Sequence, residues 1–252
     1  MSNPKSPLST PEQELAQRTR RGFLGLGVGA AAAVGGWQWL WSQPQMGGVP
    51  MPLRRVLDAN ARLTQGALFG DQHLAPEFPP ERIQQIRANG DFGLEAPLDP
   101  ESWRLAVTPY RGAAPAQLTL ADLKKLNKLD YTAEFKCIEG WSSIVRWGGV
   151  RFRDFVSMYA PGAERAAFVS LETPDKEYFV GVDMASMLHP QTMLCFEKNG
   201  QPLELAHGAP LRLVIPVKYG IKNIKRIGAI TFSDQPPLDY WAEEGYDYYA
   251  GL

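Results

Sequence analysis

Residues 135–156 read FKCIEGWSSIVRWGGVRFRDFV, and their pattern indicates the fold class. The segment leading into it, YTAEFKC (131–137), alternates apolar and polar residues as a half-buried strand does. Cys137 ends that strand, and a Gly-Trp-Ser turn comes directly after it. A helical apolar stripe then covers 151–160. The pattern predicts a strand that carries a thiol at its tip, a tight turn and a short helix.

The same periodicities predict mostly strands in the rest of the C-terminal half. Asn199-Gly200 is the strongest short turn signal and predicts a hairpin over 192–205. Thr119 is expected to cap a short helix over 119–127, with Asp122 in its first turn. Further strands are expected at 103–107, 165–171, 177–182, 210–217 and 225–234, and a further short helix at 183–188. Few strands are separated by full crossover helices, so we expect a sheet-rich, mixed α+β fold in a single domain.

Composition narrows the class of protein. The chain has 252 residues, 44% of them hydrophobic, and can bury a full core. A formal net charge of −1 gives no reason to expect nucleic acid as a partner. The two cysteines, Cys137 and Cys195, could form one bridge at most and cannot make a disulfide scaffold. The 21 prolines and 24 glycines favour many short elements over a helical bundle.

The N-terminus has the layout of an export signal. Arg20-Arg21-Gly-Phe-Leu has the twin-arginine form, and an uncharged Gly/Ala-rich run extends from Phe23 to Trp41. Six glycines between Gly22 and Gly36 make a core helix a poor alternative. Such signals serve a route that exports folded proteins, often with a cofactor already inserted, so we expect a periplasmic protein with a prosthetic group.

Cleavage of this segment is left open. Nineteen helical residues span about 28 Å, close to the roughly 30 Å hydrocarbon core, so residues 22–41 could tether the protein to the membrane. The sequence therefore divides into an export signal or anchor (1–45), a linker and wrapping segment (46–102) and a catalytic domain (103–252). Residues 42–60 look like the linker proper, and loops with short helices are expected over 61–101.

The sequence fits the common arrangements of catalytic residues poorly. His73, His189 and His207 are the only histidines, and no two are spaced for a zinc site. There is no Gly-x-Ser-x-Gly motif and no Walker loop. A Cys-His protease with Cys137 as nucleophile stays open.

A cationic run near the C-terminus points to a bound anion. RLVIPVKYGIKNIKR (212–226) has five basic residues and no acidic one, interleaved with aliphatic residues that must be partly buried. Buried cations need an anionic partner, and the acids nearby in the sequence are too few. A thiolate together with an anion cradle suits a metal cofactor that carries a phosphate.

These motifs resemble those of the sulfite oxidase-like molybdopterin-dependent oxidoreductases. Cys-x-x-x-Trp-Ser with a later Trp-x-Gly-Val resembles their cysteine segment, and NGQPLELAHGAPLRLVIPVKYGIKNIKRIGAITFSD (199–234) resembles their second signature. The resemblance covers about residues 103–250 and is closest to the periplasmic branch that contains the methionine sulfoxide reductase catalytic subunit.

The resemblance implies a role for particular residues. Cys137 would be the thiolate ligand of molybdenum, a role that suits a soft, deprotonated ligand. The molybdenum–molybdopterin cofactor, one per chain, would be bound by Thr173, His207, Arg212, Asn223, Ile224, Lys225 and Asn89. His207 stands where the closest relatives carry an asparagine, and Asn89 lies outside the aligned region. Trp141 and Trp147 are expected either to line the pocket or to pack.

Departures from the family pattern shape the expected reaction. Ile138, Glu139, Gly140 and Trp141 come after the cysteine, where sulfite-oxidising members tend to place an arginine, and the nearest cation along the chain is Arg146. The chain ends soon after the last matching strand, without the dimerisation domain of the oxidases, which favours a monomer. We expect oxygen-atom transfer, with a neutral S-oxide or N-oxide being reduced by electrons from a separate partner, such as a membrane haem protein.

Two alternatives stay open: an oxidase of sulfite or another small anion, and a cofactor-free binding protein on the same fold. The set of Arg212, Lys218, Lys222 and Lys225 speaks against the second. The short loop after Lys225 favours a pterin without an added nucleotide.

Overall fold

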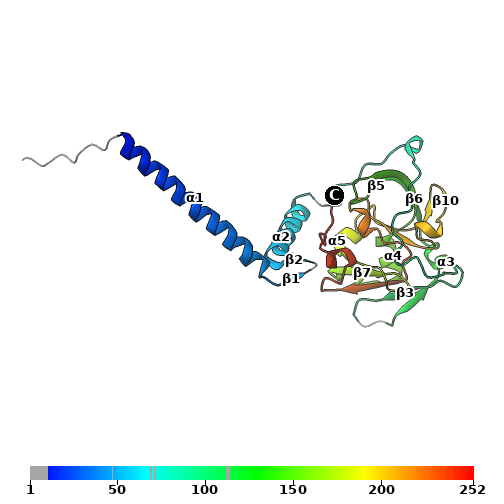
Figure 1. Cartoon of the computed structure of the whole chain (residues 1–252). Helices are drawn as coiled ribbons and strands as arrows, with labels where there is room; N and C mark the ends of the chain where they lie inside the picture. Colours follow the sequence, from blue (N-terminus) through cyan, green and yellow to red (C-terminus); the bar gives the residue numbers. More distant parts are fainter. Residues whose placement is uncertain (1–10, 47, 69, 71, 112–113) are drawn as a thin grey trace, which may run out of the picture. The chain divides into compact units, whose positions relative to one another are not determined.

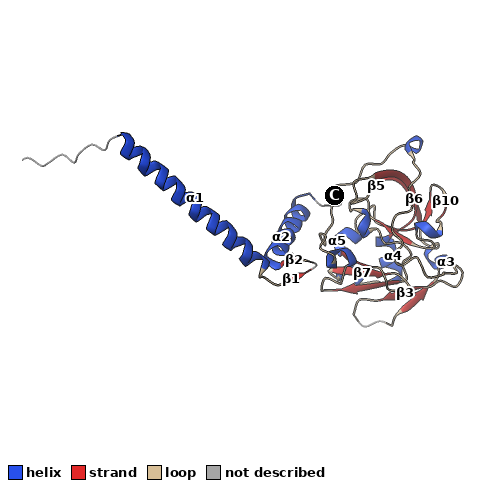
Figure 2. Ribbon diagram, in the orientation of Figure 1, coloured by secondary structure: helices blue, strands red, loops and turns tan. Residues whose placement is uncertain are grey.

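The computed structural model describes residues 11–46, 48–68, 70, 72–111 and 114–252 (Figures 1 and 2). The chain divides into two compact units, Met1–Arg55 and Val56–Leu252. The second unit is a mixed α+β domain with two five-stranded sheets, as the alternation of short apolar and polar segments predicts.

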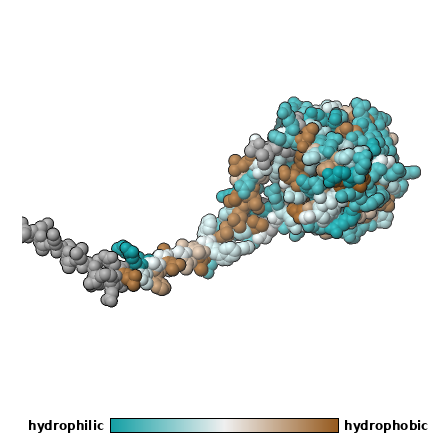
Figure 3. All heavy atoms as spheres, turned by 90° about the horizontal axis from the view of Figure 1, so that it is seen from above, coloured by the Kyte–Doolittle hydropathy of each residue, from teal (hydrophilic) through white to brown (hydrophobic). Residues whose placement is uncertain are grey.

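The first unit is helical. Helix α1 spans Pro11–Trp41, and a small hairpin comes after it, β1 (Gln45–Met46) and β2 (Val49–Pro50). Within the described part of the chain, Arg18–Trp41 is the one helical stretch long and apolar enough to cross a membrane, and none of it is buried. Its apolar side chains are visible at the surface in Figure 3. A signal sequence gives the same pattern.

Helix α2 (Met51–Leu68) is a difference from the sequence analysis, which expected a linker at residues 42–60. The helix is one continuous element of 18 residues. Pro52 lies in its first turn, where a fixed φ favours helix and the missing N–H costs nothing. Leucine, alanine and arginine, all good helix formers, make up much of the helix after Pro52.

One sheet carries the cysteine. Strand β5 (Lys128–Lys136) pairs antiparallel with β6 (Ser142–Arg151), which pairs with β9 (Met193–Lys198). Two further strands, β10 (Gln201–Pro202) and β11 (Arg212–Val214), both pair with β9. The β6–β9 register shifts between Gly148 and Gly149, where a Cβ on Gly149 would lie 2.2 Å from the Leu194 carbonyl oxygen. The Trp-Gly-Gly sequence therefore allows the two backbones to approach at this bulge.

The other sheet has the order β4-β3-β12-β7-β8. Its strands are β3 (Leu105–Thr108), β4 (Ala116–Leu118), β7 (Phe168–Glu172), β8 (Phe179–Asp183) and β12 (Ala229–Ser233). The pairing of β12 with β3 is parallel, and the other pairings are antiparallel.

Short helices fill the connections between these strands. They are α3 (Leu120–Leu123), α4 (Phe152–Tyr159), α5 (Met184–Met187) and α6 (Tyr240–Glu243), with 3₁₀ turns η1 (Pro80–Arg82), η2 (Ala163–Arg165), η3 (Leu205–His207) and η4 (Gly220–Lys222). Segment 72–102 is otherwise irregular, and it is bonded to the first sheet. The Phe78 N–H donates to the Thr132 carbonyl (2.9 Å) and that of Gln84 to the Ile144 carbonyl (2.8 Å).

The alternation of strand side chains produces two cores on opposite faces of the first sheet. Leu194 and Phe196 belong to the larger core, which also takes side chains from the second sheet and α4. Met193 and Cys195, the alternate residues of β9, belong to the smaller core with Trp147. The candidate active site is built against this smaller core.

Candidate active site

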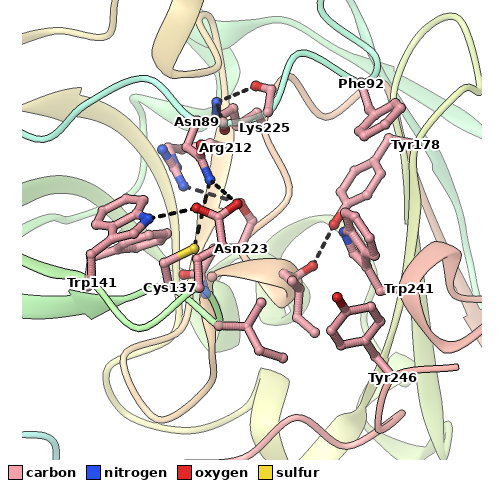
Figure 4. Close-up of a pocket in the computed structure, with 16 residues that line it drawn as sticks. Asn89, Phe92, Cys137, Trp141, Tyr178, Arg212, Asn223, Lys225, Trp241 and Tyr246 are labelled. Carbon is pink, nitrogen blue, oxygen red and sulfur yellow. Dashed lines mark hydrogen bonds between the residues drawn. The ribbon is translucent and has the colours of Figure 1, made fainter. Parts of the chain in front are cut away.

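Cys137 lies directly after β5 in a tight turn and faces a cavity. The turn is closed by its N–H, which donates to the Trp141 carbonyl (2.9 Å), and by its carbonyl, which accepts from the Gly140 N–H (3.1 Å). Gly140 has φ +87°, a conformation that favours glycine. The thiol is free and partly exposed, and the Asn89 amide nitrogen lies 3.8 Å from its sulfur (Figure 4). The turn thus presents the sulfur at the end of a rigid hairpin.

The cavity has a volume of about 240 Å³ and brings together segments far apart in the sequence. Its lining comes from the loop at 89–92, the cysteine turn, β11, the loop at 220–225 and the C-terminal segment. Five of the residues predicted from the sequence line it: Asn89, Cys137, Arg212, Asn223 and Lys225. Trp141 lines it as well, whereas Trp147 packs beneath it.

Arg212 is a buried cation with no carboxylate partner among the described residues. It is 2% exposed, and it donates hydrogen bonds to the carbonyls of His207 (3.1 Å) and Asn223 (3.2 Å). Its guanidinium carbon lies 4.8 Å from the centroid of the Trp147 ring. Burial lowers the pKa of Arg212 to about 10. An unpaired charge in this position is costly unless an anion binds beside it.

Lys225, which is half-buried, is the second such cation. Its Nζ donates to the carbonyls of Asn89 (2.7 Å) and Gly90 (2.9 Å), and no described carboxylate forms an ion pair with it. Burial, followed by the charge of Arg212, lowers the pKa of Lys225 to about 8. Both effects would be relieved by an anion between the two side chains.

The two other lysines named for the cationic run are neutralised by the protein itself. Lys218 pairs with Asp183 (3.2 Å), and Lys222 pairs with Asp239 (2.5 Å). The prediction that the whole run lacks acidic partners is wrong for these two residues, because the fold brings in carboxylates 35 and 17 positions away. For the other three basic residues of the run, Arg212, Lys225 and Arg226, no described carboxylate forms an ion pair and the prediction holds.

Asn223 lines the cavity but uses its side chain for the fold. Its Oδ1 accepts from the Ile215 N–H (2.8 Å), and its Nδ2 donates to the Tyr219 carbonyl (3.1 Å). These bonds fix the loop between η4 and Lys225.

Three predicted residues, Thr173, His207 and Ile224, are not among the residues that line the cavity. Thr173 bonds to Asp175 and Tyr178, and a Cβ on Gly93 would come within 2.4 Å of its side chain. Ile224 is buried, and its carbonyl accepts from the Leu213 N–H (2.9 Å). His207 is buried, its carbonyl accepts from Arg212, and its pKa is lowered to about 4, chiefly by burial. Their assignment as cofactor ligands stays a prediction.

Glu139 makes the cysteine turn a small polar network. Its carboxylate accepts from the Trp141 indole N–H (3.0 Å) and from the Asn89 amide (3.2 Å), and Arg87 pairs with it at 3.3 Å. The first two bonds lower the pKa of Glu139. Arg87 also lies over the Trp141 ring (4.7 Å). The cation that pairs with this turn is therefore Arg87, 52 positions before Glu139, and not Arg146, which faces Asp130. Arg87 is too far from the turn in the sequence to be recognised as its partner without the structure.

An aromatic wall, Phe92, Tyr178, Trp241 and Tyr246, was missed by the sequence analysis. In Figure 4 these rings stand on the side of the cavity opposite Cys137 and Trp141. The sequence signals two of them, Trp241 and Tyr246, through the aromatic-rich C-terminal segment YWAEEGYDYY (240–249).

Comparisons with known proteins show the family of this chain. The model of the oxidoreductase molybdopterin binding domain matches residues 93–241. The putative protein-methionine-sulfoxide reductase subunit YedZ1 of Azospira oryzae is 35% identical over 190 residues, 74% of this chain and 71% of that protein. The protein-methionine-sulfoxide reductase catalytic subunit MsrP of Campylobacter jejuni is 29% identical over 195 residues, 70% of this chain and 63% of that protein.

Among solved structures, the sulfane dehydrogenase SoxCD of Paracoccus pantotrophus has a similar fold. The TM-score is 0.50 at 20% identity, over 56% of this chain and 40% of that chain. At this identity the likeness concerns the fold.

Proposed function

This chain belongs to the oxidoreductase molybdopterin binding domain family and is an oxidoreductase, and from that premise we propose that it reduces a neutral S-oxide by oxygen-atom transfer with a molybdenum–pterin cofactor. The observation that carries the proposal is the cavity itself. It joins the Cys137 thiol to two cations, the buried Arg212 and the half-buried Lys225, that have no carboxylate partner among the described residues.

The residues present fit such a cofactor. A lysine has three N–H donors, and Lys225 uses two of them on carbonyl oxygens. An arginine has five N–H donors, and Arg212 uses two of them at 3.1–3.2 Å and a third at 3.5 Å, also on carbonyl oxygens. Both side chains therefore keep donors for a phosphate. Cys137 supplies a soft sulfur ligand from a hairpin whose turn is fixed by two backbone bonds. Thr173, His207, Asn223, Ile224 and Asn89 would shape the surroundings of the pterin.

When bound, the group supplies two-electron chemistry with exchange of an oxygen atom. The chain's own residues would bind the group and shape its surroundings. Cys137 would hold the metal, Arg212 and Lys225 would hold the phosphate, and the apolar lining would limit access of water. We assign one cofactor per chain, in the pterin form without a nucleotide.

A neutral substrate fits the lining best. The carboxylate of Glu139 is placed beside the thiol, held there by two hydrogen bonds, and would repel an anion. The cation that contacts it, Arg87, is already paired with it. Relatives named as methionine-sulfoxide reductase subunits make a sulfoxide the first choice. Oxidation of sulfite by the same cofactor is the second candidate, which the carboxylate of Glu139 beside the thiol disfavours.

The N-terminal helix supports a proposal about location. We assign residues 1–45 to a twin-arginine signal or membrane anchor, 46–102 to a connecting and wrapping segment and 103–252 to the catalytic domain, placed in the periplasm. Electrons would come from a separate partner, for which a membrane haem protein is the natural class beside a tethered domain.

Metal analysis of protein purified from its native host tests the proposal. Wild type should contain stoichiometric molybdenum, Cys137→Ser should lose it or alter its spectrum, and Cys195→Ala is the control at the other free cysteine. Turnover is then measured with methionine sulfoxide and with sulfite. Wild type without molybdenum in a host that makes the cofactor would refute the proposed function.

A further inference from the structure

Helix α2 has an apolar side that the described part of the chain leaves uncovered. Val56 is 55% and Leu63 is 71% exposed, and Leu53, close to them on the helix surface, is 42% exposed. Val56 and Leu63 belong to a row of four uncharged residues at the helical spacing i, i+4, i+7 and i+11, here called the apolar stripe: Pro52, Val56, Ala59 and Leu63. A continuous exposed stripe of this kind marks an interaction surface.

The other sides of α2 are already accounted for. Arg54 is 7% exposed, and Leu57 and Ala61, three and seven positions further on, are half-buried. On a helix these positions lie opposite the apolar stripe, so they mark the side that the protein itself covers. The stripe could not turn onto the protein without exposing that side. The exposed charges lie together on one flank between the two sides: Arg55, Asp58 and Arg62.

Helix α1, which precedes α2, indicates what covers the stripe. Its stretch Arg18–Trp41 is long and apolar enough to cross a membrane. Trp37 and Trp39, near its C-terminal end, are 62% and 59% exposed, and tryptophan is enriched where a span leaves the hydrocarbon core. Arg20 and Arg21 come before the uncharged stretch. Because basic residues next to a span stay on the cytoplasmic side, α2 would emerge on the outer side.

The connection between the two helices is short and folds back on itself. Nine residues separate Trp41 from Met51, and β1 and β2 pair as a hairpin within them. The Met51 N–H, at the start of α2, donates to the Pro44 carbonyl (2.9 Å). A span that ends at Trp41 therefore leaves the start of α2 at the surface of the same membrane.

We propose that α1 is retained as a membrane anchor and that α2 lies flat on the outer surface of that membrane, with its apolar stripe among the lipid acyl chains. This inference goes beyond the proposed reaction and rests on the assignment of residues 1–45 as an anchor instead of a cleaved signal. Amphipathic helices bind a bilayer in this way, with the apolar side buried about 5–10 Å deep. Arg55 and Arg62, on the flank of the stripe, would reach the lipid phosphates.

Photo-crosslinking in native membranes tests which molecule covers the stripe. The photoreactive residue p-benzoylphenylalanine is incorporated into the full-length chain in its native host, at Val56 or at Leu63. Incorporation at Asp58, on the charged flank of the same helix, is the matched control. After irradiation, mass spectrometry identifies the adducts. Phospholipid adducts should form from Val56 and Leu63 and be largely absent from Asp58.

A second set of variants separates the contribution of α2 from that of α1. With the photoreactive residue at Ala59, Val56→Asp combined with Leu63→Asp should lose most of the lipid adduct, because a carboxylate is costly to bury among acyl chains. The protein should stay in the membrane fraction, since α1 is unchanged. Val56→Leu combined with Leu63→Ile keeps the stripe apolar and should keep the adduct.

Three results would overturn the inference. Adducts from Val56 and Leu63 to this chain, to a second copy or to another protein would make the stripe a protein interface. No adduct from either position would mean that the stripe faces water. An intact mass of the native protein without α1 would show that the anchor is removed.

A failure of this inference is distinct from a failure of the proposed function. The α2 variants should keep the unfolding temperature and the molybdenum content of wild type. A wild-type protein without molybdenum would refute the enzyme mechanism and leave the lipid adducts of α2 unchanged.

Discussion

The buried pair of Lys222 and Asp239 offers a direct test of how the cavity loop is held. Lys222 is 1% exposed, and besides the ion pair its Nζ donates to the Gly181 carbonyl (3.0 Å). Asp239 is 3% exposed, and it also accepts from the N–H groups of Gly181 (3.1 Å) and Ala242 (3.0 Å). The pair therefore joins η4, which leads into the cavity loop, to β8 and to the start of α6. Asp239→Asn removes the charge and keeps the size.

The expected loss of stability is large. Removing one partner leaves a buried, uncompensated charge, which costs about 3–5 kcal/mol. For a domain of this size, each kcal/mol lowers Tm by about 2–4 °C, so Tm should fall by roughly 6–20 °C. Lys222→Met combined with Asp239→Asn should recover most of the loss, because it removes the stranded charge.

The pH dependence gives an independent check on the cause. Burial lowers the pKa of Lys222, and Asp239 opposes that shift. In Asp239→Asn the pKa should fall further, so the unfolded chain binds a proton that the folded protein does not, up to the usual lysine pKa of about 10.4. Stability of this variant should therefore rise with pH above neutrality, and its deficit relative to wild type should shrink.

Thermal unfolding followed by circular dichroism at pH 7 and pH 9 measures both effects. Asp234→Asn is the control, because its pair with Arg111 is exposed (46% and 73%) and should contribute little to stability. If Asp239→Asn lost no more stability than Asp234→Asn, or if the double variant were no better than the single one, the buried-charge argument would be wrong.

Three further predictions concern single positions. The pKa of His207 is lowered to about 4, so between pH 6.5 and pH 4 this imidazole binds a proton in the unfolded chain but not in the folded one, and stability should fall as the pH drops through this range. Urea unfolding at pH 7 and pH 5 should show a smaller loss of stability for His207→Asn than for wild type. Gly149→Ala should destabilise by at least about 1–3 kcal/mol, measured by thermal unfolding, because its Cβ would lie 2.2 Å from the Leu194 carbonyl oxygen. Gly208 has φ +99°, and a Cβ added there would lie 2.9 Å from the Cα of Lys225, so Gly208→Ala should displace that lysine and lower the molybdenum content; unchanged content would contradict the anion site.

Local signals predicted local structure well. Thr119 caps α3, and its hydroxyl and N–H form a reciprocal capping box with Asp122. Asn199 and Gly200 take positive φ values of 51° and 78° at the turn between β9 and β10. Each of these features depends on residues within a few positions of one another, so the sequence contains the whole cause.

Ion pairs between residues far apart in the sequence could not be predicted from local patterns. The cationic run suggested five charges without an acidic partner, but Asp183 and Asp239 neutralise two of them through the folded chain. The pairing of Arg87 with Glu139 spans 52 positions. Helix α2 was missed for another reason, since its start has no Ser, Thr, Asp or Asn cap and glycines and prolines precede it.

The loop at 89–96 shows why the candidate site is more than its two sequence motifs. Lys225 donates to the carbonyls of Asn89 and Gly90, and the next residue, Arg226, donates to those of Leu94 (2.9 Å) and Ala96 (2.8 Å). Two adjacent cations of the second motif thus fix both ends of a loop that neither motif contains. That loop in turn brings the Asn89 amide to the Cys137 sulfur. An anion bound at Lys225 would therefore stabilise the loop, and the loop would keep Lys225 at the anion. In the proposed cofactor site, the phosphate end and the metal end of the cavity would then be coupled through one segment of backbone.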